Sequence, residues 1–243
     1  MSVSIKSARE IALMRESGRI LAEVHERLGE EIKPGISTYE IDQIGEKMIR
    51  GYGCTPSFLN YNGYPASICV SVNDEVVHGI PSKKRILKEG DIVSLDAGVI
   101  WKGYHSDAAK ISKEAQDLID ATRQSFYEGL KMAKSGNHLN DISKAIDFYI
   151  SSFGYGIVRD LVGHGVGSDL HEDPQIPNFA QRRRGVKLRP GMTLAVEPMI
   201  NMGGWKVEWL DDDWTVVTKD GSLSAHYENT ILITDGEPEI LTI

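Results

Sequence analysis

The spacing of apolar residues predicts two helices at the start of the chain. Between residues 7 and 30, apolar or small side chains recur every three or four positions, the pattern of a helix with one buried face. These positions are Ile11, Met14, Gly18, Leu21, His25 and Leu28. The sequence KPG at 33–35 ends this helix, and Ser37 or Thr38 can begin a second one, TYEIDQIGEKMIRGYG, which ends at glycine.

The pattern then changes from helical to strand-like. Four stretches between Ser67 and Ala109 are typical of strands: SICVSV, EVVHGI, DIVSLDAGV and GYHSDA. Two further helical stretches cover residues 113–134 and 139–153, and strand-like sequence returns from Gly156 onward. The order helix, helix, strands therefore occurs twice, which predicts an α+β fold with helices segregated from antiparallel strands.

The second occurrence repeats the first at a distance of 101 residues. The matching positions are Lys33 and Lys134, Gly35 and Gly136, Ile41 and Ile142, Ile49 and Ile150, Gly53 and Gly154, Leu87 and Leu188, and Gly90 and Gly191. The most informative match pairs Asp96 with Glu197, because both acids lie in apolar, strand-like sequence (VSLDAGV and TLAVEPMI). We expect residues 1–243 to form one domain made of two related halves, about 1–110 and 111–243.

The composition is typical of a soluble globular protein. The 243 residues are 41% hydrophobic and 26% charged, and the net charge of −8 disfavours binding to nucleic acid or to anionic membranes. No apolar run approaches the length of a membrane-spanning helix. Two cysteines, Cys54 and Cys69, are a poor disulfide framework, and the first residues carry charges in place of an apolar signal segment. We therefore expect a reduced, cytoplasmic protein.

Two aspartates interrupt the apolar stretch VSLDAGVIWKGYHSDAA at 93–109. If this stretch forms an antiparallel hairpin that turns around Trp101 and Lys102, Asp96 lies directly opposite Asp107 on one face, about 5 Å away. Two ionised carboxylates at that distance repel each other, unless a divalent metal lies between them. The alternatives are a carboxyl pair that shares one proton, or an aspartate that caps a turn.

Three more residues have the chemistry of metal ligands. Glu197 lies in LAVEPM, Glu228 in the β-branched stretch LSAHYENTILIT, and His164 between glycines in LVGHGVG. Each one alone is explained by a solvated strand acid or a core histidine, but four acids and a histidine together favour a metal site. The number of carboxylates suits two ions, and the absence of thiolates favours Mn²⁺, Fe²⁺, Co²⁺ or Zn²⁺. Such a site points to hydrolysis, in which His78 and His171 are candidates to stabilise an oxyanion.

Five stretches of the chain resemble those of methionine aminopeptidase, in its short bacterial type I form among the M24-type metallopeptidases. They are YNGYPASICVSVNDEVVHGIP, GDIVSLDAGVIWKGYHSDAA, LVGHGVGSDLHEDPQIPNF, LRPGMTLAVEPMI and DDDWTVVTKDGSLSAHYENTILIT. The resemblance covers nearly the whole chain. It implies a pseudo-two-fold "pita-bread" fold, a curved antiparallel sheet backed by two pairs of helices. It also implies a metal-dependent aminopeptidase that removes the initiator methionine from nascent polypeptides by means of a metal-bridged hydroxide.

The resemblance assigns a role to each candidate residue. The implied ligands of two divalent ions are Asp96, Asp107, His164, Glu197 and Glu228. Asp107 and Glu228 would bridge the ions, and Glu197 would also accept a proton from the nucleophilic water. His171 would contact the scissile carbonyl, and His78 would stabilise the intermediate or assist the leaving amine.

The resemblance also implies a pocket for the methionine side chain. Its lining residues would be Tyr61, Tyr64, Cys69, Leu170 and Trp214, and aromatic rings of this kind suit a thioether. Members of the family carry an asparagine that helps to bind a monovalent cation, and Asn73 matches it. The partners implied are nascent polypeptide N-termini and a transient contact with the ribosome, and we expect a monomer that does not bind membranes.

One segment departs from the family pattern. After Asp107 the sequence AAKISKEAQDLID goes almost directly into helical sequence, with Ser112 as a candidate cap, so several strand residues are expected to be missing. A shortened strand would hold Asp107 less rigidly. This departure leaves open a catalytically weakened relative that acts as a binding or scaffold protein. A prolidase or Xaa-Pro aminopeptidase is a second alternative, although those enzymes usually carry an extra N-terminal domain.

Overall fold

Four α-helices, in two pairs, form the helical part of the structure. The structure is a computed structural model that describes residues 3–112 and 116–243. Within those residues the helices are α1 (Ala8–Glu31), α2 (Thr38–Gly51), α3 (Gln116–Met132) and α4 (Leu139–Ser151). The four predicted helices are therefore present, although the predicted start of the third, at 113–115, lies outside the described residues. None of the helices described has the length and apolar character needed to cross a bilayer.

Serine residues begin both helices of the first pair. The Ser7 side chain accepts a hydrogen bond from the amide of Glu10, and the Glu10 carboxylate accepts one from the Ser7 amide. Ser37 and Glu40 form the same reciprocal cap at the start of α2, so Ser37, and not Thr38, is the capping residue. Each cap satisfies amides that a helix leaves without an internal partner.

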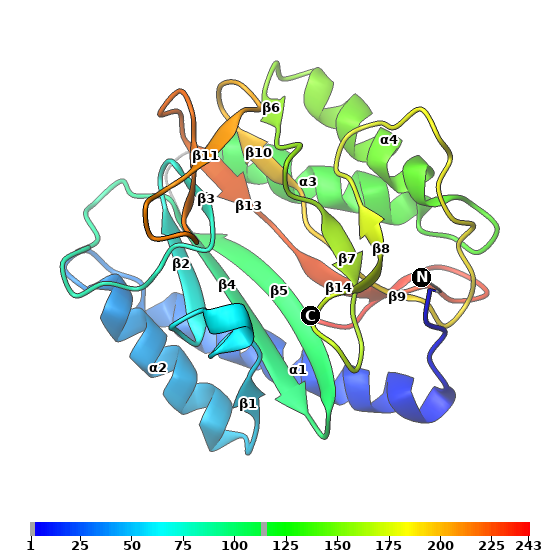
Figure 1. Cartoon of the computed structure of the whole chain (residues 1–243), viewed down its shortest axis with the longest axis horizontal. Coiled ribbons are helices and arrows are strands. Elements are labelled where there is room, and N and C mark those ends of the chain that lie inside the picture. The colour runs from blue at the N-terminus through cyan, green and yellow to red at the C-terminus, as the bar shows by residue number, and fades with distance from the viewer. Residues whose placement is uncertain (1–2, 113–115) are drawn as a thin grey trace.

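The first half of the chain builds a sheet around one long hairpin. The strands of this sheet are β1 (Thr55–Pro56), β2 (Ile68–Val72), β4 (Val93–Trp101) and β5 (Tyr104–Ser112). β5 pairs with β4 along its whole length, and β1 and β2 pair with successive parts of β4. The helices α1 and α2 lie beside this hairpin, and α3 and α4 lie across the molecule from them (Figure 1).

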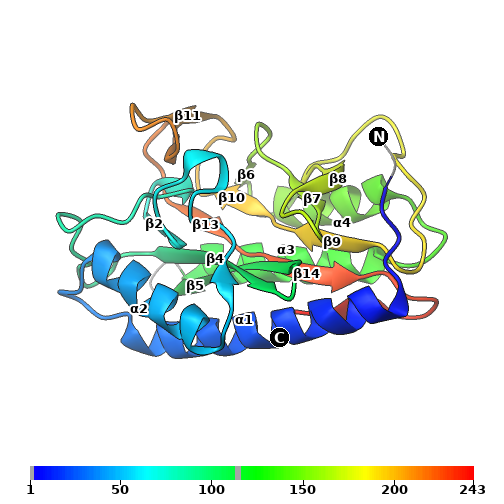
Figure 2. The same cartoon turned by 60° about the horizontal axis from the view of Figure 1, so that its bottom comes forward.

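The second half builds its sheets from shorter strands. They are β6 (Gly156–Ile157), β7 (Gly163–Gly165), β8 (Glu172–Ile176), β9 (Thr193–Val196), β10 (Met199–Asn201), β13 (Ser224–His226), β14 (Asn229–Leu232) and β15 (Glu239–Ile240). A separate sheet joins β3 (Glu75–Val77), β12 (Val216–Thr218) and β11 (Val207–Trp209), so it draws on both halves. In Figure 2, α1 runs along the lower side of the molecule, and β11 rises on the upper side.

Contacts at the start of the second helix of each pair recur 101 residues apart. Ser37 forms an isolated antiparallel bridge with Ile86, and His138 forms the same bridge with Lys187. The Gly35 amide donates to the carbonyl of Leu87 at 2.8 Å, and the amide of Gly136 donates to that of Leu188 at 3.0 Å. Gly35 and Gly136 have φ angles of 94° and 93°, a conformation that favours glycine. These repeats support our proposal that one domain contains two related halves.

The register of the β4–β5 hairpin differs from the sequence prediction. Asp96 pairs with Ala109 and Asp107 with Gly98, so the two aspartates are diagonal neighbours, and the predicted direct opposition is wrong. The turn lies at Lys102 and Gly103, one residue later than predicted. Both have positive φ angles (49° and 86°), as a tight two-residue hairpin turn requires. Because the shift is by two positions, both aspartates still face the same side of the sheet.

The strand that follows Asp107 is not cut short within the described residues. β5 continues for five residues beyond Asp107, to Ser112, which pairs with Val93. Ser112 is thus a strand residue, and its predicted role as a cap of the third helix stays a prediction, because residues 113–115 lie outside the described residues. The expected loosening of Asp107 loses its structural basis, because Asp107 lies in the middle of a fully paired strand.

Candidate active site

The five predicted ligands come from five different places in the fold and meet in one cleft. Asp96 lies on β4, Asp107 on β5 and His164 on β7, whereas Glu197 directly follows β9 and Glu228 joins β13 to β14. All five line a cavity of about 890 Å³. Both halves of the chain therefore contribute acids to the same point.

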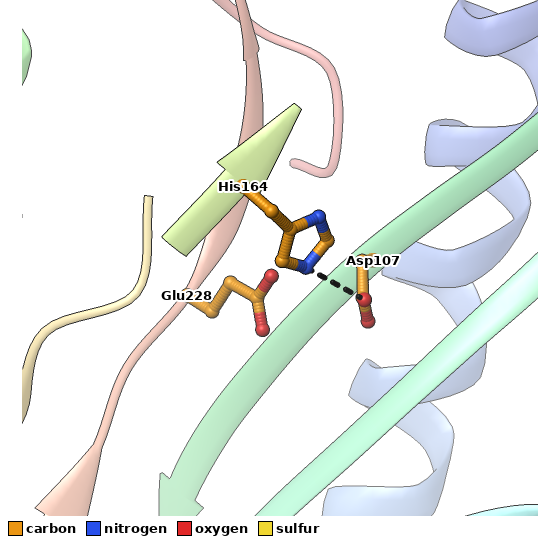
Figure 3. A group of neighbouring side chains, drawn as sticks. All are labelled: Asp107, His164 and Glu228. Atoms are coloured by element: carbon orange, nitrogen blue, oxygen red, sulfur yellow. Dashed lines mark ion pairs between the residues drawn. The ribbon is translucent and has the colours of Figure 1, made fainter. Parts of the chain in front are cut away.

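His164 faces the carboxylates with a ring nitrogen that is free to bind a cation. Its Nε2 lies 3.8 Å from Asp107 Oδ2 and 3.5 Å from Glu197 Oε1, and Figure 3 shows the side chains of Asp107, His164 and Glu228 converging. Its Nδ1 lies 2.8 Å from the carbonyl oxygen of Gly165, which can only accept, so Nδ1 carries the proton. Burial lowers the pKa of His164 to about 3, with the nearby His171 as a further cause. A neutral ring with an unprotonated Nε2 is the form of histidine that ligates metals.

In the part of the chain that the structure describes, the four acids are buried without a lysine or arginine partner. Burial raises the pKa of Asp96 to about 7 and those of Asp107, Glu197 and Glu228 well above their usual values. Among the residues that the structure describes, histidines alone form ion-pair contacts with these carboxylates. An oxygen of Asp96, one of Asp107 and one of Glu228 are buried without a hydrogen-bond partner in residues 3–112 and 116–243.

A bound divalent cation would supply the positive charge that these buried carboxylates lack. Buried carboxylates are costly unless a positive group lies beside them. One oxygen each of Asp107 and Glu228 and a ring nitrogen of His164 lie within 4.8 Å of one another, as do atoms of Glu197, His226 and Glu228. These residues fit divalent metal, since carboxylate and imidazole are ligands of the first-row transition ions.

Hydrogen bonds hold the strands that carry the acids. The hydroxyl of Thr230, on β14, accepts from the amide of Asp107 at 3.1 Å and donates to its carbonyl at 3.0 Å. The hydroxyl of Thr242 in turn accepts from the Thr230 amide and donates to the side-chain carbonyl of Asn229. Asn178 donates to the carbonyl oxygen of Glu197 at 2.9 Å. The ligand-bearing backbone is therefore tied across both halves of the chain.

His171 and His78 both line the same cavity as the acids. The ring of His171 lies 4.2 Å from that of His164, between centroids, and its Nδ1 lies 2.7 Å from the hydroxyl of Tyr61. His78 has a left-handed φ of 59°, and its ring lies 6.2 Å from that of Trp214. Burial lowers the pKa of both histidines, that of His78 to about 4, so each is neutral at pH 7.

An apolar pocket opens directly beside the acids. It belongs to an apolar cluster in which Phe58, Tyr64, Ala66, Cys69 and Leu170 are buried and Tyr61, Ile80 and Trp214 pack against them. All of these except Ala66 and Ile80 line the cavity that holds the acids. The five residues predicted from the sequence to surround a methionine side chain thus lie in one cluster. The rings of Tyr64 and Trp214 meet edge to face, with 5.1 Å between centroids.

The family is decided by the sequence match. Residues 12–235 match the model of metallopeptidase family M24. The chain belongs to this family.

Named relatives of this M24 chain are methionine aminopeptidases. It is 52% identical to methionine aminopeptidase 1 of Bacillus subtilis over 98% of both chains, and 51% identical to methionine aminopeptidase of Clostridium acetobutylicum over 99% of both. The crystal structure of methionine aminopeptidase from Thermotoga maritima superimposes with a TM-score of 0.96, at 42% identity over 99% of each chain. The predicted pita-bread α+β fold is confirmed by this match.

The M24 chain also contains a buried histidine at the acid cluster that the sequence analysis missed. His226 Nε2 lies 3.7 Å from Glu197 Oε2 and 3.7 Å from Glu228 Oε2. Its signal was available, because His226 precedes Glu228 by two residues, and alternate residues of a strand share a face. Phe58 was missed as well, since its sequence context, SFLN, has no strand or helix periodicity.

Asn73 lies at the turn between β2 and β3 of this M24 chain. Its side-chain amide donates to Asp91 at 2.9 Å, and its side-chain oxygen accepts from the amide of Ile92. Its backbone carbonyl accepts from the amide of Ser224. The predicted role of Asn73 in binding a monovalent cation stays a prediction.

Proposed function

We propose that the protein is a metal-dependent methionine aminopeptidase, which removes the N-terminal methionine from peptides and nascent proteins. The observation that carries this proposal is the convergence of four buried, cation-poor carboxylates and His164 beside an apolar pocket lined by rings. The near-complete mutual coverage with named methionine aminopeptidases supports it over the prolidase-type alternative. Neither the strand after Asp107 nor the relatives give support to a non-catalytic scaffold.

The proposed metal ligands are the residues predicted from the sequence: Asp96, Asp107, His164, Glu197 and Glu228. Asp107 and Glu228 are the proposed bridging residues for two ions. When bound, divalent cobalt, manganese, iron or zinc would lower the pKa of a water molecule and polarise the substrate carbonyl. This ligand set contains carboxylates and an imidazole but no thiolate, which suits any of these four metals. Cys69 belongs to the neighbouring pocket and not to the proposed ligands.

The chain's own groups would then handle the protons and the substrate. Glu197 is the proposed acceptor of the proton released by the nucleophilic water. The Tyr61 hydroxyl can donate to His171 Nδ1, which would leave the proton on Nε2. His171 Nε2–H is then the proposed donor to the scissile carbonyl oxygen. His78 is the proposed second group for the intermediate or the leaving amine.

The pocket would select methionine by its shape and by contacts to the polarisable thioether sulfur. A thioether chain needs apolar walls without unpaired polar groups, and the hydroxyl of Tyr64 is turned away to the carbonyl oxygen of Gly79 at 3.1 Å. Ring edges and the buried thiol of Cys69 make favourable contacts with sulfur. Nascent polypeptide N-termini are therefore the proposed substrates. The proposed setting is a cytoplasmic monomer in transient contact with the ribosome, and a monovalent cation at Asn73 belongs to the same proposal.

Hydrolysis of a Met-Ala-Ser peptide tests the proposal. Protein stripped of metal by chelation and then reloaded with Co²⁺ or Mn²⁺ should release free methionine, and the stripped protein should not. The variant His171→Ala should keep its metal content but lose about 10²- to 10³-fold in kcat, as expected when a donor to an oxyanion is removed. Folded, metal-replete wild-type protein that releases no methionine would refute the proposal.

A further inference from the structure

His226 is placed at the acid cluster by the pairing of β13 with β10. The register sets His226 opposite Met199, and the His226 amide approaches the hydroxyl of Ser94 at 3.4 Å. The His226 side chain is almost completely buried, with 2% of it exposed. Neither ring nitrogen of His226 has a hydrogen-bond partner among the described residues. A buried imidazole without partners is rare, because buried polar atoms normally find a hydrogen bond, a water molecule or an ion.

The surroundings of His226 match those of His164, the imidazole already proposed as a ligand. His164 Nε2 lies 3.5 and 3.8 Å from one oxygen each of Glu197 and Asp107, and His226 Nε2 lies 3.7 Å from one oxygen each of Glu197 and Glu228. The two rings approach different oxygens of Glu197, so that this carboxylate lies between them.

These separations are those of atoms that share an ion. Two ligand atoms each about 2.1 Å from a first-row metal are about 3.0 Å apart at a right angle and about 3.8 Å apart at a wide angle. A direct N–H···O hydrogen bond would be about 2.9 Å long. The ligand atoms of Glu197, His226 and Glu228 lie within 4.8 Å of one another and form a group that could hold a metal ion.

We propose that His226 is a sixth protein ligand of the metal centre, and that it binds through Nε2 on the side of Glu197 opposite to His164. The inference rests on the proposed metal-dependent function. Coordination through Nε2 leaves the ring proton on Nδ1. The centre then has two imidazole ligands, His164 and His226, which favours borderline ions such as Zn²⁺, Co²⁺ and Fe²⁺ over Mn²⁺.

Proton NMR of the Co²⁺-loaded full chain tests this assignment, because the paramagnetic ion shifts the N–H proton of each coordinated imidazole far from the normal range. Wild-type protein should show two such signals that vanish in D₂O. His226→Gln should lose one signal and bind Co²⁺ at least about 10-fold more weakly by calorimetry. His164→Gln should lose the other signal, and the matched control His138→Gln, at the start of α4, should keep both.

The outcomes separate this inference from the proposed function. One shifted signal in the wild type, unchanged in His226→Gln, would refute ligation by His226 and leave the metal-dependent activity standing. No binding of Co²⁺ by folded wild-type protein would refute the metal centre as a whole. The wild-type signal count needs no substitution, so it decides the question even if His226→Gln fails to fold.

Discussion

The acids lie on two antiparallel strand pairs that differ in continuity, the β4–β5 hairpin and the pairing of β9 and β10 with β14 and β13. In the first half, β4 and β5 are continuous strands, and Asp96 and Asp107 lie diagonally across them. In the second half, the ladder breaks, because β9 stops before Glu197 and β13 stops before Tyr227. The pairs on either side of the break, Val196 with Asn229 and Met199 with His226, keep one register. That register places Glu197 opposite Glu228, the direct opposition that we had predicted for the aspartates.

The break has a local cause in the sequence. Glu197 is followed by Pro198, which has no amide hydrogen and cannot donate to a ladder. The carbonyl of Pro198 still accepts from the Tyr227 amide at 3.2 Å, so the strands stay together. The short aspartates are thus held by a regular sheet, whereas the longer glutamates extend from an interrupted one. If the two halves are related as we propose, the acids of each half differ in how the local strand pairing presents them.

Removing one proposed ligand from each strand pair is expected to have the largest effect. Asp107→Asn and Glu228→Gln should each lower kcat/KM by at least about 10³-fold, because each takes a charge from a proposed bridging position. Metal analysis should show fewer than two ions per chain for either variant. If one variant keeps full metal content and activity, the residue changed in it does not bridge two metal ions.

The hydrogen bonds between Thr230 and the backbone of Asp107 link the two strand pairs, and they can be removed without changing an acid. Thr230→Val keeps the shape of the side chain but removes both hydrogen bonds to the backbone of Asp107. We expect a loss of about 1–3 kcal/mol in unfolding free energy, measured by urea titration, because a buried amide and carbonyl lose a partner. Thr230→Ser should restore most of it. Thr234→Val, at an exposed turn, is the matched control and should cost less than 1 kcal/mol.

The smallest expected effect is the change in stability of the metal-free protein with pH. This change tests the burial of all four acids together. Their pKa values are raised in the folded state, so they stabilise the protein at low pH and this contribution is lost as pH rises through the folded values. The buried histidines have lowered pKa values, and their opposing effect ends near pH 6.5.

Above pH 6.5 the histidines no longer offset the effect of the four acids on stability. Chelated protein should lose on the order of 1 kcal/mol of stability between pH 6.5 and 8, visible as a falling Tm. Saturating Mn²⁺ should remove the decline, since the ion favours the charged carboxylates. A Tm that rises over this range without metal would contradict the placement of the acids.

The sequence predicted the parts of the molecule that local patterns control. Helix faces and caps follow from spacing and from Ser37 with Glu40, and the 101-residue shift matched one pair of acids, Asp96 with Glu197. The hairpin register could not be read as reliably, because it depends on whether the two left-handed turn positions fall on Trp101 and Lys102 or on Lys102 and Gly103. That choice is made by the whole β4–β5 pairing.

The missed site residue has a different explanation. His226 obeys the two-residue alternation with Glu228, so the strand pattern contained it. Its burial, however, depends on the pairing of β13 with β10 and on contact with Glu197, which lies 29 residues earlier. Contacts of that kind between distant segments are absent from any local pattern.

The chain of hydrogen bonds from Thr242 through Thr230 to Asp107 sets an order of events during protein synthesis. Asp107 is made early, but its backbone is held by a strand that Thr242 braces, only one residue from the end of the described chain. Such long separations between contacting residues slow folding. In a growing chain the hairpin that carries the first two acids is therefore made before Thr230 and Thr242, and the hydrogen bonds to the backbone of Asp107 can form only after those residues have been made.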